Sequence, residues 1–316
     1  MPSWHNTRRQ YTYELSRTMK ACPHNLTLFF YSRYQEQGHD SALTLDYRTS
    51  QIGVEAPGQT FQCCQPGEGD ADEHSILIVG DDPGILEVYT ELLETVWPGC
   101  RVLQAVNERL ALDVLRCVRP SLVLLDLMMP DGDGFSMLEA MQSDEHLRAI
   151  PVIILTAQVL TRPDVAQLND EIAAILITGL FTAEEMLAHV KQVLAGSKKL
   201  HSAARHMVRE VMAYIHEHYA EPLTRDALAK VASVSSRHLT RCFNAEVGIP
   251  PMTYLNRYRI REAMRLLRQD HKSITEVARA VGFSNNAYFD VVFRREVGLA
   301  PSDYRRCHQA LDQRHV

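Results

Sequence analysis

A repeat near the C-terminus constrains the fold of this chain more than any other feature. Six residues recur at an offset of 50 positions: Phe243, Glu246, Val247, Gly248, Pro251 and Tyr254 match Phe293, Glu296, Val297, Gly298, Pro301 and Tyr304. Upstream, residues 228–230 resemble 277–279, and Ser235 matches Ser284, at an offset of 49. Self-similarity at a fixed period indicates a repeated structural unit. The sequence therefore predicts two copies of one small unit.

Each copy has the pattern of two short helices joined by a tight turn. The expected helices span residues 225–231 and 236–247 in the first copy and 274–280 and 285–297 in the second. Side-chain oxygens at helix starts predict the N-caps Thr224, Ser235, Ser273 and Ser284. Gly248 and Gly298 end the second helix of each copy, as a glycine commonly does. Each copy is thus expected to be a helix-turn-helix.

Charge is distributed unevenly along the 316 residues. Residues 200–316 contain 18 Lys and Arg against 12 Asp and Glu, whereas the first 199 residues contain 15 against 27. A basic C-terminal part behind an acidic N-terminal part indicates that only the former binds a polyanion. A modest net charge of +6 also suits a solvated helical surface, so the repeat is the stronger signal.

The second copy contains the most distinctive stretch. Residues 274–284 read Ile-Thr-Glu-Val-Ala-Arg-Ala-Val-Gly-Phe-Ser, and residues 298–306 read Gly-Leu-Ala-Pro-Ser-Asp-Tyr-Arg-Arg. With Tyr288, Phe289 and Phe293, these stretches make the region from Met207 to Arg306 resemble the AraC/XylS-type DNA-binding domain. The resemblance implies seven helices, two helix-turn-helix units and sequence-specific binding to double-stranded promoter DNA. It also implies RNA polymerase as a partner, and a homodimer is a further expectation.

The distance between the two copies fits two successive major grooves of DNA. A helix is expected over residues 252–269, and 18 residues at about 1.5 Å each span roughly 27 Å. With the connecting turns, this length approaches the roughly 34 Å between major-groove faces one helical turn apart. One chain is therefore expected to place two recognition helices in successive grooves.

The resemblance also assigns DNA-contacting positions to the two recognition helices. These positions are Arg237, His238, Thr240 and Arg241 in the first copy and Asn285, Asn286, Arg294 and Arg295 in the second. Arginine reads guanine and asparagine reads adenine in the major groove, although contact with phosphate alone carries about equal weight. Arg294 and Arg295 are expected to contact phosphate, or to serve only as solubilising charges. The first copy is expected to read more bases, because Val291 stands where the family often has arginine.

The middle of the chain alternates apolar strands with helices. The expected strands are residues 76–79, 101–105, 122–125, 152–155 and 173–177, and the expected helices are 85–96, 108–117, 135–142 and 182–194. Fully apolar runs suit buried parallel strands. The pattern predicts a flavodoxin-like, doubly wound parallel sheet of five strands, with helices on both faces.

Acidic side chains follow the strands of this domain. Asp81 and Asp82 follow the first strand, Asp126 ends the third and Thr156 ends the fourth. Ligands bind at the carboxyl ends of parallel strands, and clustered carboxylates there need a cation or a proton. Oxygen ligands are what Mg²⁺ uses. The sequence therefore predicts an acidic pocket with Mg²⁺ as a possible cofactor.

The stretch from Ser75 to Ala195 resembles the receiver domain of two-component response regulators. Residues 125–134, Leu-Asp-Leu-Met-Met-Pro-Asp-Gly-Asp-Gly, are close to the family's phosphoacceptor loop. The resemblance implies that Asp126 accepts a phosphoryl group, and that Asp81, Asp126 and the carbonyl of Met128 ligate Mg²⁺. It implies that Thr156 hydrogen-bonds the phosphoryl oxygens and switches orientation on phosphorylation.

This sequence departs from the receiver pattern at functional positions. Gly80 stands where the family has the first of two acids, and Gly179 stands where it has a lysine. Leu176 and Leu180 replace the family's switch aromatic and proline. A lysine ammonium offsets phosphoryl charge and couples its arrival to loop movement, which glycine cannot do. Arg162 is a candidate substitute whose position the sequence does not fix.

Three functions remain open at this point. One is a DNA-binding regulator whose degenerate receiver serves as a regulatory or interaction module. The second is a conventional response regulator controlled by phosphorylation of Asp126 by a sensor histidine kinase. The third is a fragment of a hybrid sensor kinase system, although no ATP-binding or histidine-box feature is present. No nucleophile–base set is recognisable either, so the chain is not expected to be an enzyme.

The expected organisation has five parts. These are a poorly ordered arm (1–74), the receiver-like domain (75–196), a linker (197–204), the AraC-type domain (205–308) and a tail (309–316). Seven scattered cysteines without metal spacing indicate reduced thiols. The chain has no run of 18 apolar residues and no apolar signal core, so a cytoplasmic location without a membrane partner is expected.

Overall fold

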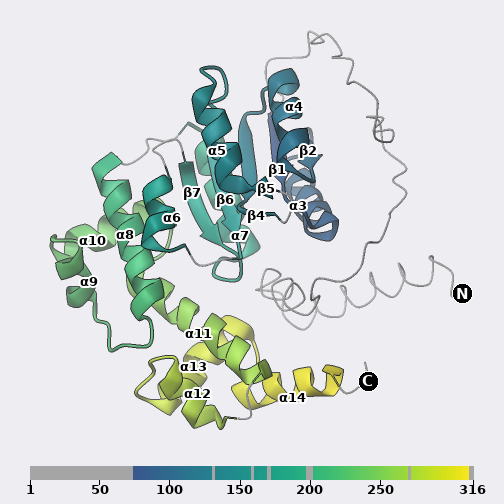
Figure 1. Cartoon of the computed structure of the whole chain (residues 1–316). Coiled ribbons are helices and arrows are strands. Elements are labelled where there is room, and N and C mark those ends of the chain that lie inside the picture. Colours follow the sequence, from purple (N-terminus) through teal and green to yellow (C-terminus); the bar gives the residue numbers. More distant parts are fainter. Residues whose placement is uncertain are drawn as a thin grey trace, which may run out of the picture.

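The computed structural model describes residues 74–129, 132–157, 160–168, 172–196, 202–269 and 272–312 (Figure 1). The expectation of a poorly ordered arm therefore falls, apart from His74, outside the described residues. None of the helices in these ranges is both long and apolar enough to cross a membrane. None of the cysteines in the described ranges, which are Cys100, Cys117, Cys242 and Cys307, belongs to a disulfide.

A five-stranded parallel sheet forms the first half of the described chain. Its strands are β1 (Ser75–Val79), β2 (Arg101–Ala105), β3 (Leu122–Asp126), β6 (Val152–Thr156) and β7 (Ile172–Ile177). The order β2-β1-β3-β6-β7 makes β7 an edge strand. β1, β3 and β6 are buried along almost their whole length, as fully apolar runs require. The predicted sheet is confirmed.

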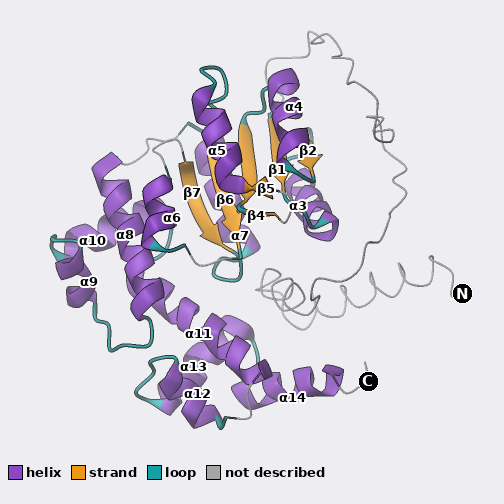
Figure 2. Ribbon diagram, in the orientation of Figure 1, coloured by secondary structure: helices purple, strands orange, loops and turns teal. Residues whose placement is uncertain are grey.

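Helices cover both faces of this sheet, as Figure 2 shows. They are α3 (Pro83–Val96), α4 (Glu108–Val118), α5 (Gly134–Ser143), α6 (Arg162–Gln167) and α7 (Ala183–Leu194). Thr182 caps α7 in a capping box with Glu185. The sequence reading missed α6, which Thr161 and Asp164 cap in the same way. It also missed the short hairpin of β4 (Met128–Met129) and β5 (Gly132–Asp133).

Seven helices follow the sheet domain in the described residues, as predicted. They are α8 (Ser202–His218), α9 (Arg225–Val231), α10 (Ser236–Val247), α11 (Pro251–Gln269), α12 (Ile274–Ala280), α13 (Asn286–Val297) and α14 (Pro301–Asp312). α8 begins inside the predicted linker, and α14 continues past residue 308. We call α9 with α10 the first unit and α12 with α13 the second unit. In Figure 1, α11 leads from the first unit to the second.

Three of the four predicted N-caps in these units are confirmed. Thr224, Ser235 and Ser273 each accept a hydrogen bond from the backbone of the helix that they precede. The fourth prediction, Ser284, is wrong. Asn285 caps α13, because its Oδ1 accepts the Tyr288 N–H at 3.0 Å. An asparagine is as good a cap as serine, and here it stands one residue nearer the helix.

The repeat in sequence is also a repeat in packing. The ring of Phe243 meets Tyr254 edge-on at 5.5 Å between centroids, and Phe293 meets Tyr304 in the same way at 5.7 Å. All four side chains are buried. Such edge-to-face pairs stabilise beyond their buried area by about 0.5–1.5 kcal/mol. In each copy the pair fixes a recognition helix against the next helix of the domain.

The turn of the second unit depends on Gly282. Its φ of +89° lies in the left-handed region. A Cβ there would lie 2.7 Å from the carbonyl oxygen of Tyr219, which is backbone and cannot swing away. A side chain is therefore excluded at this turn. The first unit has Ser233 in the same place, also with positive φ.

The hydrophobic core divides inside α11 rather than between the two predicted domains. One cluster of buried residues runs continuously from the sheet through α8 and α10 to Tyr258. A second cluster begins at Ile260 and holds α12, α13 and α14 together. The sheet domain and the first unit therefore share one core, and the second unit has its own.

His216 lies at the junction within the shared core. Its Nδ1 is 3.2 Å from the carbonyl of Leu160, just before α6, and its Nε2 is 2.8 Å from the hydroxyl of Tyr254. Its ring also stacks on Tyr258. The pKa of His216 is lowered to about 3, mainly by burial; the Leu160 carbonyl opposes this shift and the nearby Arg261 adds to it. The imidazole is therefore neutral in the folded protein.

We predict that His216 makes stability depend on pH. Below its ordinary pKa of about 6.5, the unfolded chain binds a proton at His216 that the folded protein rejects until about pH 3. The free energy of unfolding should therefore fall by about 1.4 kcal/mol at this site between pH 7.5 and 5.5. Urea unfolding of wild type and His216→Gln at both pH values measures this. An equal pH dependence in the two proteins would contradict it.

Candidate functional site

The predicted acidic pocket forms at the carboxyl end of the sheet. Asp126 ends β3, Thr156 ends the neighbouring β6, and Asp81 follows β1 on the other side of β3. Thr156 is fully buried, whereas Asp81 and Asp126 are half-buried. The three residues that the sequence placed at strand ends therefore come from three adjacent strands. Asp82 is not part of this group, because its carboxylate caps α3 by accepting from the N–H of Gly84 at 2.8 Å.

Electrostatics at Asp126 reflect a pocket rich in carboxylates. Burial raises the pKa of Asp126 to about 7, and the neighbouring Asp81 adds to the rise. The backbone N–H of Met128 donates to Asp126 Oδ1 at 2.9 Å and opposes this pKa shift. Among the described residues, no cationic side chain contributes to the pKa of Asp126.

The donor set of this pocket fits a magnesium ion. Two carboxylates that repel each other, with the backbone of Met128 beside them, are a typical arrangement of hard oxygen ligands. Asp81, Asp126 and the Met128 carbonyl are the residues that would hold Mg²⁺. The ion would neutralise charge on an incoming phosphoryl group.

The two glycine replacements differ in what they permit. A Cβ on Gly80 would lie 3.6 Å from the Cβ of Asp126, in ordinary contact, so the family's first acid has room there. Gly179 has a φ of +87°, where a side chain is strained. The loop that follows β7 is thus built for glycine and not for the family's lysine.

Tyr89 is a pocket residue that the sequence reading missed. Tyr89 lies on α3. Burial and then the charge of Asp126 raise the pKa of Tyr89 to about 12, and its hydroxyl is hydrogen-bonded to the side chain of Thr178. Thr178 directly precedes Gly179. A tyrosine on an amphipathic helix carries no sequence signal that separates this position from ordinary core packing.

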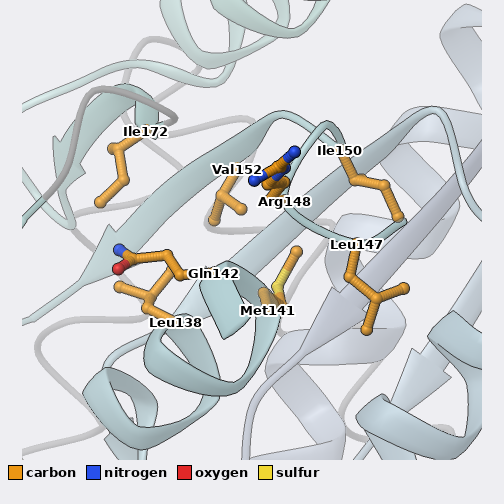
Figure 3. Close-up of a pocket in the computed structure, with 8 residues that line it drawn as sticks. All are labelled: Leu138, Met141, Gln142, Leu147, Arg148, Ile150, Val152 and Ile172. Carbon is orange, nitrogen blue, oxygen red and sulfur yellow. The ribbon is translucent and has the colours of Figure 1, made fainter. Parts of the chain in front are cut away.

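A small cavity at the opposite end of the sheet is not a ligand site. Figure 3 shows its lining, which is mostly apolar: Leu138, Met141, Gln142, Leu147, Arg148, Ile150, Val152 and Ile172. Its volume of about 10 Å³ is at the lower limit for one water molecule.

The first recognition helix, α10, exposes basic side chains. Arg237 and Arg241 are exposed, and Arg241 is hydrogen-bonded to the ring of His238 at 2.9 Å. The hydroxyl of Thr240 donates to the carbonyl of Ser236 within the helix. Since the shared core takes the other face of α10, these four predicted positions lie together on the side away from it.

The second recognition helix, α13, presents a different surface. The side chain of Asn285 caps the helix, and Asn286 donates to Thr275 of α12 at 3.0 Å. Arg294 is paired with Asp290 at 3.1 Å and Arg295 with Glu296 at 2.7 Å. All four predicted residues are exposed. Their polar groups are already engaged within the protein, unlike Arg237 of the first unit, for which no such bond is seen among the described contacts.

Three arginines of the helical domain outside the predicted set, Arg205, Arg209 and Arg257, donate to backbone carbonyls of the sheet domain. Arg209 of α8 donates to the carbonyl of Ile172, at the start of β7, at 2.9 Å. It also lies 3.9 Å from Glu246 at the end of α10. The side chain of Arg209 is only 3% exposed, so this pair is almost free of competing water.

Arg257 of α11 makes the corresponding contacts for the second unit. Its guanidinium donates to the carbonyl of Leu180, just after β7, at 2.9 Å, and forks onto both oxygens of Glu185 at 2.7 and 3.0 Å. Its Nε donates to Glu296 of α13 at 3.1 Å. The pKa of Glu185 lies below its ordinary value. Burial, the largest single effect, raises this pKa, but the other interactions of Glu185, chiefly those with Arg257 and the Thr182 backbone, together lower it by more.

Known families match both halves of this arrangement. The response regulator receiver domain model matches residues 76–194, and a helix-turn-helix domain model matches residues 228–307. The HTH-type transcriptional activator RhaS of Salmonella schwarzengrund is 38% identical over 106 residues. That match covers 34% of this chain and 38% of RhaS, so the chain spans well under half the length of this relative.

Solved structures resemble each half separately. The C-terminal domain of AraT, a response regulator from Geobacillus stearothermophilus, is 32% identical, with a TM-score of 0.31 and coverage of 32% of this chain and 84% of that one. The receiver domain of a signal transduction histidine kinase from Syntrophus aciditrophicus is 32% identical, with a TM-score of 0.35 and coverage of 41% and 96%. The name of the relative RhaS describes a transcriptional activator. The chain thus contains one region that matches response regulator receiver domains and a second region that matches helix-turn-helix domains.

Proposed function

We propose that this chain binds promoter DNA through α10 and α13 in successive major grooves, and that its receiver domain controls DNA binding by packing against both units. Arg237, His238, Thr240 and Arg241 would contact bases in the first groove. Asn285, Asn286, Arg294 and Arg295 would position the second. The observation that carries the proposal concerns two arginines. Arg209 binds the carbonyl of Ile172 at the start of β7, and Arg257 binds the carbonyl of Leu180 just after its end.

These contacts are strong enough to orient the helical domain. Arg257 is bound to a carbonyl and two carboxylates while only 15% exposed, and bidentate charge-assisted hydrogen bonds hold a fixed geometry. Because a buried arginine without its partners is costly, alternative arrangements of α11 against the receiver are disfavoured. The spacing of the two recognition helices along DNA would then depend on the receiver.

The receiver is proposed to act mainly as an interaction module. Gly80 removes one acid from the pocket, and the left-handed backbone at Gly179 disfavours the family's lysine. A phosphoryl group on Asp126 would lack the cation that couples phosphorylation to movement of the loop after β7.

Phosphorylation of Asp126 by a sensor histidine kinase is the second candidate function. It is favoured by the convergence of Asp81, Asp126 and Thr156 at neighbouring strand ends. The loop that carries Leu180 connects this pocket directly to Arg257. A change at the pocket would therefore have a short route to the second unit.

Further partners follow from the proposed role. RNA polymerase is the expected partner at a promoter. A homodimer, if formed, would use a receiver surface other than α6, β7 and α7, because α8, α10 and α11 contact these elements.

We predict that Glu185→Gln weakens the coupling between the two units. Glutamine preserves the capping box with Thr182 but removes the charge that Arg257 binds. Loss of these bonds should lower the free energy of unfolding by about 1.5–3 kcal/mol. The protein's gain in affinity from a second half-site on the duplex should also become smaller. Titrating the protein with duplexes that carry one or two half-sites measures this gain.

Asp113→Asn is the matched control for this change. It removes an exposed ion pair, with Arg116 of α4, that contributes about 1 kcal/mol or less and lies outside the proposed DNA surface. If Glu185→Gln destabilised the protein but left the gain from the second half-site unchanged, the receiver would not be setting the geometry of DNA binding.

We also predict that acetyl phosphate with Mg²⁺ labels wild-type Asp126 poorly. Gly80→Asp should increase labelling, because a carboxylate there would lie beside Asp126 and restore the missing ligand. Intact-protein mass spectrometry measures the added phosphoryl group, and Asp126→Ala is the blank. Stable, near-complete labelling of wild type that Asp126→Ala abolishes would favour phosphorylation as the control.

A further inference from the structure

The second recognition helix exposes an apolar surface that its own fold does not use. Val291 is 64% exposed and Tyr288 is 51% exposed, the two highest values among the exposed large hydrophobic side chains of the described residues. Ala287 is exposed as well. Positions three and four apart lie on one face of a helix, so these residues are neighbours.

The core of the second unit takes the other face of α13. Phe289, Val292, Phe293 and Val297 are buried there. Tyr288 is held at the edge of the exposed surface, because its hydroxyl accepts a hydrogen bond from Asn256 of α11 at 3.1 Å. Ala287 and Val291, four residues apart, form a fixed apolar row beside it.

Polar groups surround this row without entering it. Asn286 is bonded to Thr275, and Arg294 to Asp290 on the next turn. On α10, by contrast, the exposed positions hold Arg237 and Arg241, which can donate to guanine. The row on α13 has no hydrogen-bond donor, and the base feature that an apolar side chain can recognise in the major groove is the thymine C5-methyl group.

We propose that Ala287 and Val291 contact thymine methyl groups in the major groove that α13 enters. This inference rests on the proposed function, in which α13 is a recognition helix. The charges of Arg294 and Arg295 on the following turn suit the adjacent phosphates. The second half-site would then be selected for thymine by apolar contact, whereas the first is selected by arginine.

The experiment begins with a duplex selected from a random library by the full chain. Each thymine in this duplex is replaced in turn by deoxyuridine, which lacks only the C5-methyl group. Wild type should bind about fourfold more weakly when the contacted thymine is replaced, the effect of one buried methyl group. The penalty should be confined to one half-site.

Variants assign the effect to the side chain. Val291→Ala should reduce the uracil penalty at that position, because the two γ-methyl groups of valine are absent. Val96→Ala, which truncates an exposed valine on α3, should keep the penalty. Both residues are exposed, so neither change removes core packing.

Three results would overturn the assignment. If wild type tolerates uracil at every position, DNA binding stands but thymine methyl recognition does not. If the penalty persists unchanged in Val291→Ala, another side chain makes the contact. If the library yields no bound duplex, the proposed function fails and this inference fails with it.

Discussion

The polar contacts between the helical domain and the edge strand β7 centre on two arginines, the buried Arg209 and the half-buried Arg257. Arg209 binds the carbonyl of Ile172 at the start of the strand, and Arg257 binds the carbonyl of Leu180 just after its end. Each arginine also faces the glutamate that ends a recognition helix, Glu246 or Glu296. An edge strand has backbone groups without strand partners, and a buried guanidinium needs acceptors. The carbonyl of Ile172 and the guanidinium of Arg209 therefore satisfy each other.

This arrangement explains why the hydrophobic core does not divide where the sequence changes from alternating strands and helices to helices alone. α8 lies against α6, and His189 of α7 is 3.2 Å from the carbonyl of Val247 at the end of α10. A side chain on Gly248 would press against the same histidine. The first unit is therefore packed as part of the receiver, whereas the second unit keeps its own core and is joined mainly through Arg257. One half of the helical domain shares the core of the sheet domain, and the other half is held by a polar contact.

The sequence predicted what depends on local pattern. Apolar runs gave the five strands, and side-chain oxygens at helix starts gave the caps at Thr224, Ser235 and Ser273. The repeat gave both units. The pattern could not separate Ser284 from Asn285 as the N-cap of α13, because serine and asparagine cap helices equally well. The roles of Arg209, Arg257 and Tyr89 were not predictable, since a polar group on a helix does not reveal which distant backbone or carboxylate it meets. Asp81, Asp126 and Thr156 were predictable as one group because the carboxyl ends of parallel strands lie at the same edge of a sheet.

Hydrogen–deuterium exchange in increasing denaturant tests the central claim, that the receiver and the first unit form one cooperative body, most directly. If β7, α8 and α10 share a core, their slowest amides should open with a common free energy, while those of α13 open separately at a lower one. If instead α8 and α10 opened together with α13, well below β7, the helical domain would be an independent body, and the account would be wrong.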